Sequence, residues 1–145
     1  MSKSSDTRLG FYRDQVYRAP LKTVWEAATE ARHLNRFFTS GARGNISPDL
    51  DPVHWQWGKT LSAEIEVVSC EPYKFFEFRW TAPGQREPTR VRIEFSRANR
   101  RTIVRVYEAG WKSTEVDGAL DHCGGWSEWL YGLKAYVQHG IDLRK

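Results

Sequence analysis

The stretch from Thr114 to Gly140 carries the pattern that most constrains the fold. Thr114 and Asp117 resemble an N-terminal capping pair, and Gly140 is placed for a left-handed C-terminal cap. A helix of this length would run about 40 Å, and so apolar a helix must be covered by other elements. Apolar residues recur every three or four positions, the period of one helix face, at Leu120, Cys123, Trp126, Leu130, Leu133 and Val137.

Glycines interrupt this predicted helix. Each costs up to about 1 kcal/mol in a helix interior, so their presence predicts either a kink or a neighbouring surface that comes unusually close. They are Gly118, Gly124, Gly125 and Gly132.

Length and composition are those of one ordinary soluble domain. The chain has 145 residues, of which 40% are hydrophobic and 28% charged. Seven tryptophans, seven phenylalanines and six tyrosines are a heavy aromatic load for this size. Rings in such number need large partners or a cavity.

Charge and cysteine usage narrow the function classes. The net charge of +4 is spread along the chain and is dense only at Arg97–Arg101, which reads as a turn, so we expect no nucleic-acid partner. Cys70 and Cys123 lack metal-ligand spacing, and the four histidines lack it too. Without a signal peptide or an apolar run long enough for a bilayer, we expect a reduced, cytoplasmic protein with no membrane contact, metal or cofactor.

The first third of the chain predicts one strand and two short helices. The strand is clear in composition, but whether Arg13 or Asp14 points inward stays open. Pro20 suits the first turn of the helix that follows. In order, we expect a mobile leader at residues 1–8, a strand at 9–18, helices at 21–30 and 31–38, and a loop at 39–52.

From Val53 onward the apolar period changes from helical to alternating, which is typical of strands with one buried face. Short connections between the strands predict an antiparallel meander, covered by the terminal helix. This is an α+β domain over residues 9–145, and a bent sheet under one rod-like helix tends to leave a cavity. The apolar positions are Trp55 and Trp57, then Leu61, Ala63, Ile65 and Val67, then Phe76, Phe78 and Trp80, then Val91, Ile93 and Phe95, then Val104 and Val106.

The chain resembles the START-like, helix-grip superfamily, the SRPBCC fold of the birch-pollen allergen. Within it, the chain is most similar to homologues of the C-terminal domain of the activator of the heat-shock-protein-ninety ATPase. The resemblance runs from about Leu9 to Gly140. The residues that carry it are Ala19-Pro20, Val24-Trp25, Ala28-Thr29, Glu71-Pro72, Phe78-Arg79-Trp80, Thr102 to Gly110, His122, Gly125-Trp126, Leu130, Leu133-Lys134, Tyr136 and Gly140.

The resemblance implies a curved antiparallel sheet, two short helices and a long C-terminal helix that enclose a cavity. Superfamily members bind lipids, hormones or polyketides, and some catalyse cyclisation or hydrolysis there. The eukaryotic activators also carry an N-terminal domain that anchors the chaperone, which we do not expect in these 145 residues. Where the family usually has a Gly-rich strand, this chain has His54–Trp57, which predicts a narrower or more aromatic pocket.

Glu108 and His122 are the candidate polar residues of the cavity. If Val104 and Val106 point inward, Glu108 is the next residue in phase, and a carboxylate there must reach solvent or find a partner. His122 lies near the start of the terminal helix, so the two side chains could meet at the cavity mouth. The hypotheses are a pair that orients a ligand, a general base, or a structural hydrogen bond at the rim.

Aromatic residues supply the candidate lining, although the simpler interpretation of any one of them is a core residue. Trp25 and Trp129 are interpreted as packing residues. Cys123 is interpreted as a small buried hydrophobe, with a reactive thiol as the alternative. The candidate ligand-binding residues are Trp55, Trp57, Phe76, Phe78, Trp80, Glu108, His122, Trp126 and Leu130.

The sequence therefore predicts a protein that binds a small, largely apolar or aromatic ligand between sheet and helix. A cavity enzyme of cyclase or hydrolase type would use Glu108 or His122, and a chaperone-associated stress-response protein would act through its outer surface. The sequence identifies neither the ligand nor the oligomeric state.

Overall fold

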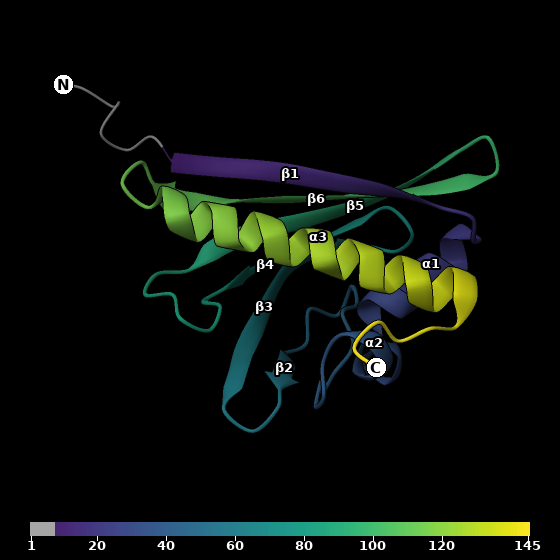
Figure 1. Cartoon of the computed structure of the whole chain (residues 1–145), viewed down its shortest axis with the longest axis horizontal. Helices are drawn as coiled ribbons and strands as arrows, with labels where there is room; N and C mark the ends of the chain where they lie inside the picture. The colour runs from purple at the N-terminus through teal and green to yellow at the C-terminus, as the bar shows by residue number, and fades with distance from the viewer. Residues whose placement is uncertain (1–7) are drawn as a thin grey trace.

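The computed structural model describes residues 8–145, and Figure 1 shows the arrangement of the elements. The predicted leader at residues 1–8 lies outside the described part, except Arg8, which begins the first strand. The elements are β1 (Arg8–Tyr17), α1 (Leu21–Thr29), α2 (Ala31–Phe37), β2 (Val53–Trp57), β3 (Leu61–Glu71), β4 (Phe75–Trp80), β5 (Thr89–Ala98), β6 (Arg101–Lys112) and α3 (Val116–His139).

A six-stranded antiparallel sheet forms one layer, in the order β1-β6-β5-β4-β3-β2. Helix α3 lies along one face of this sheet. Helices α1 and α2 lie near the C-terminal half of α3 (Figure 1). This confirms the predicted α+β architecture, a curved antiparallel meander with two short helices and one long terminal helix. No helix among residues 8–145 has the length and apolar character needed to cross a membrane.

Burial alternates along the central strands as the sequence predicts. In β5, for example, Val91 and Ile93 are fully buried and the intervening Arg92 is only partly covered. Side chains of one strand face therefore build the core against α3, while the charged residues between them face outward.

The register of β1, which the sequence leaves open, is fixed by contacts of two neighbouring residues. Arg13 faces the helix, where its Nε donates to Ser127 Oγ at 3.0 Å. Asp14 faces outward and pairs with Arg105 at 2.8 Å. Two bulges, at Leu9/Gly10 and in β3, bend the sheet around α3.

The C-terminus of α3 agrees with the prediction and its N-terminus does not. Gly140 caps the helix in the left-handed conformation with φ +64°. The helix begins at Val116, and Glu115 occupies the N-cap, so the predicted pairing of Thr114 with Asp117 is wrong. Within the described residues, no side chain caps the first turn, and the Glu115 carboxylate accepts the Lys112 N–H at 2.7 Å, which closes the turn before the helix.

Leu120 was predicted on the inward face of α3, and it is 64% exposed. The first turns of the helix present Gly118 to the sheet instead, where an added Cβ would lie 3.2 Å from the Trp111 ring. Two residues further along a helix, a side chain points to nearly the opposite side. A close neighbour thus accounts for Gly118.

Candidate functional site

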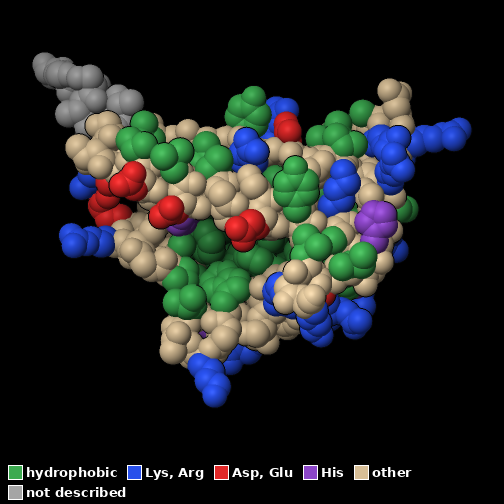
Figure 2. All heavy atoms as spheres, in the orientation of Figure 1, with side chains coloured by type: hydrophobic (Ala, Val, Ile, Leu, Met, Phe, Trp, Pro, Cys, Tyr) green, Lys and Arg blue, Asp and Glu red, His purple; other side chains and the backbone are tan. Residues whose placement is uncertain are grey.

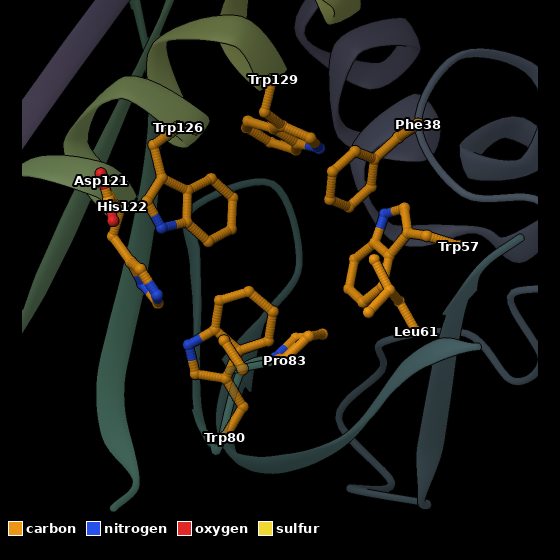
Figure 3. A pocket seen from close by; sticks show the side chains of 11 residues that line it. Phe38, Trp57, Leu61, Trp80, Pro83, Asp121, His122, Trp126 and Trp129 are labelled. Atoms are coloured by element: carbon orange, nitrogen blue, oxygen red, sulfur yellow. The ribbon is translucent and has the colours of Figure 1, made fainter. Parts of the chain in front are cut away.

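A pocket of about 240 Å³ opens between α3 and the ends of β2, β3 and β4. Figure 2 shows it as a hollow beneath the helix, floored by hydrophobic side chains. Helix α3 supplies one wall, and the end of α2, strands β2 to β4 and the loop after β4 supply the rest (Figure 3). The lining residues are Phe38, Trp57, Leu61, Trp80, Ala82, Pro83, Asp121, His122, Gly125, Trp126 and Trp129.

Aromatic rings form a closed circuit around this pocket, and we call it the aromatic circuit. Its members are Phe38, Trp57, Trp80, Trp126 and Trp129. Each ring is a neighbour of the next, with centroid separations between 5.4 and 6.4 Å all the way round. Figure 3 shows the five rings arranged around a common space. Three of the five neighbouring pairs are edge-to-face, a preferred geometry for aromatic contacts, and the other two are tilted.

Behind the aromatic circuit lies a buried carboxylate with four hydrogen-bond partners. Glu108, on β6, is 1% exposed. Its Oε1 accepts from Trp126 Nε1 at 2.8 Å and contacts His122 Nδ1 at 2.9 Å. Its Oε2 accepts from Trp80 Nε1 at 2.9 Å and from Thr89 Oγ1 at 2.5 Å. Such a set of donors offsets the cost of burying a charge.

These contacts give Glu108 a positioning role. Indole N–H groups can only donate, so the carboxylate fixes the orientation of Trp80 and Trp126 in the circuit. It also fixes His122, whose Nδ1 donates when Glu108 accepts. Among residues 8–145, the Nε2 of His122 has no hydrogen-bond partner, so this atom remains available at the pocket wall.

The structure divides the predicted ligand-binding residues into two groups. Trp57, Trp80, His122 and Trp126 line the pocket. The remainder lie in the packed interior, where neighbouring side chains separate them from the open space; they are Trp55, Phe76, Phe78, Glu108 and Leu130.

Trp55 illustrates the division. It is fully buried, because the rings of Phe38, Trp57, Phe78 and Trp80 surround it at centroid distances of 5.4 to 6.2 Å. The aromatic residues therefore fill the deep part of the space between sheet and helix. The pocket occupies only its mouth.

Several lining residues were not predicted from the sequence. Trp129, interpreted there as a packing residue, is 2% exposed and forms part of the wall. The sequence did contain a signal for Trp129. Gly125, Trp126 and Trp129 lie three, four and seven positions after His122, and residues at that spacing share one face of a helix. The other missed residues are Phe38, Leu61, Ala82, Pro83, Asp121 and Gly125.

Two buried indole N–H groups, of Trp55 and Trp129, have no hydrogen-bond partner in the described part of the chain. Both rings meet neighbours edge-on, at 88° between Trp55 and Phe38 and 82° between Trp129 and Trp126. Aromatic faces are weak acceptors in such arrangements.

The described residues include no cluster of three or more His, Cys, Asp or Glu side chains arranged to hold a metal ion. Cys123, one of the predicted inward residues of α3, is a free, partly buried thiol.

A curved antiparallel sheet closed by one long C-terminal helix, with a pocket between them, defines the helix-grip class of protein. Residues 18–138 match the family described as "Activator of Hsp90 ATPase homolog 1-like protein". The chain belongs to this family, which confirms the resemblance seen in the sequence. Among curated proteins, none matches the sequence significantly.

Solved structures share the fold at low sequence identity. SSP2350 from Staphylococcus saprophyticus has a TM-score of 0.81 at 20% identity, over 94% of this chain and 96% of that one. The Aha1 dimer from Colwellia psychrerythraea has a TM-score of 0.76 at 18% identity, over 91% and 98%. DynU16, from the dynemicin biosynthetic locus, has a TM-score of 0.80 at 21% identity over 90% of this chain. The match spans about half (48%) of DynU16. At these identities, the likeness shows the fold alone.

Proposed function

We propose that the protein binds a small, largely apolar or aromatic molecule in the pocket beneath α3. The observation that carries this proposal is the aromatic circuit, which encloses an open space with few polar groups. Ligand pockets typically measure about 300 to 1,000 Å³. At about 240 Å³, this one suits a compact guest, or one end of a longer molecule that extends into solvent.

His122 is the side chain proposed to hydrogen-bond the guest. Its Nε2 is available at the pocket wall, and the Glu108 contact at 2.9 Å fixes the direction of the ring. Packing against Trp111 at 5.1 Å and Trp80 at 5.9 Å restricts the ring further. A guest with an apolar body and one polar group matches this wall.

A cyclase or hydrolase activity is the alternative at the same site. Glu108 is covered and carries four partners, so such a reaction would depend on His122 as the proton-exchanging group. Turnover of a guest identified by binding, and its loss in His122→Ala, would distinguish the enzyme from a carrier.

A chaperone-associated role is the alternative favoured by the family to which the chain belongs. It would use the outer surface. Capture of heat-shock protein ninety that survives obstruction of the pocket would support this role over ligand binding.

Two adjacent glycines of α3 offer a matched test. A Cβ added at Gly125 or at Gly124 meets no atom within 4 Å, so larger side chains fit at both positions without a clash at that atom. Gly125 lines the pocket and Gly124 does not. The variants Gly125→Leu and Gly124→Leu therefore gain similar helix propensity, and only the first obstructs the pocket.

The experiment is a saturation-transfer NMR screen of small aromatic and aliphatic compounds against wild type and both variants. We expect compounds that bind wild type and Gly124→Leu and fail to bind Gly125→Leu. Equal binding to all three proteins would place the site elsewhere and refute the proposal, as would a screen in which no compound binds.

A further inference from the structure

This inference rests on the proposed function and concerns the chemistry of the guest. The aromatic circuit has edges of 5.4 to 6.4 Å. If the five centroids lay in one plane, their centre would be about 5 Å from each of them, within the distance of about 6 Å at which a ring face attracts a cation. Four of the five rings are tryptophans, the residue with the strongest such attraction.

A negative charge lies at the N–H edges of two of these rings. Trp80 and Trp126 both donate their indole N–H to the buried Glu108 carboxylate, at 2.9 and 2.8 Å. Donation to an anion polarises the indole and makes its face more electron-rich. Because Glu108 is 1% exposed, water screens its field only weakly.

The rim of the pocket carries an acidic side chain in a protein whose net charge is +4. Asp121 lines the pocket, and among residues 8–145 it has no ion-pair partner. Figure 2 shows acidic side chains on α3 directly above the hollow. Among the lining residues, Asp121 is the one Asp, Glu, Lys or Arg, and its negative charge suits a cationic guest.

The chemistry of the lining favours some kinds of cation over others. A primary ammonium carries three N–H donors that need acceptors, and an aromatic wall supplies few. A methylated ammonium spreads its charge over apolar methyl groups, so it loses little hydration free energy when it leaves water for the pocket. Quaternary ammonium groups are commonly recognised by cages of aromatic rings. We infer that the group enclosed by the aromatic circuit is a quaternary or multiply methylated ammonium of a small organic cation.

The test compares choline with 3,3-dimethylbutan-1-ol, which has the same shape with carbon in place of the charged nitrogen. Affinities are measured by calorimetry or by quenching of tryptophan fluorescence. We expect choline to bind at least tenfold more tightly than the alcohol. Equal binding, or tighter binding of the alcohol, would overturn the inference and leave the proposed function intact. Failure of choline to bind would also overturn it, while the Gly125→Leu screen tests the proposed function separately.

Fluorinated tryptophan provides a second readout, because fluorine is only slightly larger than the hydrogen that it replaces. Fluorine withdraws electrons from the ring face, so choline affinity should fall stepwise from unlabelled to monofluorinated to difluorinated protein, with the alcohol unaffected. A flat series for choline would contradict a cation held against the rings.

The rim charge is tested by Asp121→Asn, with Glu66→Gln on the exposed side of β3 as the control. We expect a loss of about twofold to fivefold in choline affinity for the first, reduced by added salt, and none for the second. An unchanged choline affinity in Asp121→Asn would show that the charge at the rim does not contribute to recognition of the cation.

Discussion

Replacement of Glu108 by glutamine tests the buried network, because the change keeps the shape of the side chain and removes its charge. One carboxylate oxygen becomes an NH2 group, which donates and cannot accept. If the NH2 replaces Oε2, it faces the Trp80 N–H; if it replaces Oε1, it faces the Trp126 N–H. Thr89 and His122 can adapt, by rotation of the hydroxyl or by a change of tautomer. Either orientation therefore leaves one buried indole N–H without an acceptor.

The expected cost follows from these contacts. A buried donor without a partner costs about 1–3 kcal/mol, and the remaining hydrogen bonds lose the strengthening that a charged acceptor provides. Removing a buried charge offsets part of this loss, since a carboxylate is costly to take out of water. Because four donors already compensate Glu108, we expect the loss to dominate. The free energy of unfolding should fall by about 2 kcal/mol.

The assay is urea unfolding at pH 7, followed by tryptophan fluorescence and by circular dichroism. Glu66→Gln is the matched control, since Glu66 is exposed on β3 and should change stability by no more than about 0.5 kcal/mol. A Glu108→Gln protein as stable as wild type, or more stable, would refute the view that hydrogen bonds to Glu108 outweigh the cost of burying its charge.

Three further predictions concern groups away from the pocket. Tyr17 Oη donates to the Leu130 carbonyl at 2.9 Å and burial raises its pKa, so it stays protonated, and Tyr17→Phe should destabilise the fold by about 1 kcal/mol in urea unfolding. Burial lowers the pKa of His33, and the positive charge of Arg32 adds to the effect. As the pH falls, the His33 imidazole is therefore protonated in the unfolded chain before it is protonated in the folded protein. Stability present above about pH 6.5 should then fall as the pH drops through the lowered pKa, and His33→Gln should flatten that decline in unfolding curves; an unchanged slope would contradict it. Burial also raises the pKa of the Cys70 thiol. In Cys123→Ser protein, where Cys70 is the remaining cysteine, iodoacetamide should therefore react with Cys70 more slowly at pH 8 than it reacts with free cysteine. An equal rate would show that Cys70 is open to solvent.

Most of the fold is readable from the sequence because its signals are local. Alternation in β3 to β6 and the three-and-four spacing in α3 need only near neighbours in the chain, and both give the correct elements. The predicted capping pair of Thr114 with Asp117 is wrong because the helix begins at Val116, after a turn that the bond from the Lys112 N–H to the Glu115 carboxylate closes. Leu120 was misplaced because a period of three and four does not show which residue of the first turns faces the sheet, a place that Gly118 takes against Trp111.

The site is less readable, because it depends on contacts between distant strands. Trp55 and Trp57 share a strand and a face, yet one is fully buried and the other lines the pocket. The Glu108 network requires the register that places Glu108 opposite Val91 and Trp80 opposite Thr89. The alternation of inward residues along β6 identified Glu108 from the sequence. The position of His122 near the start of the terminal helix suggested that the two side chains meet. The indole donors could not be assigned without the sheet.

Native mass spectrometry of freshly purified protein tests most directly whether the pocket holds a guest. For wild type and for Gly124→Leu, we expect a fraction of the protein to carry one additional small molecule, which extraction then identifies. Gly125→Leu, prepared identically, should carry none. The same bound mass at the same occupancy on Gly125→Leu would contradict binding beneath α3.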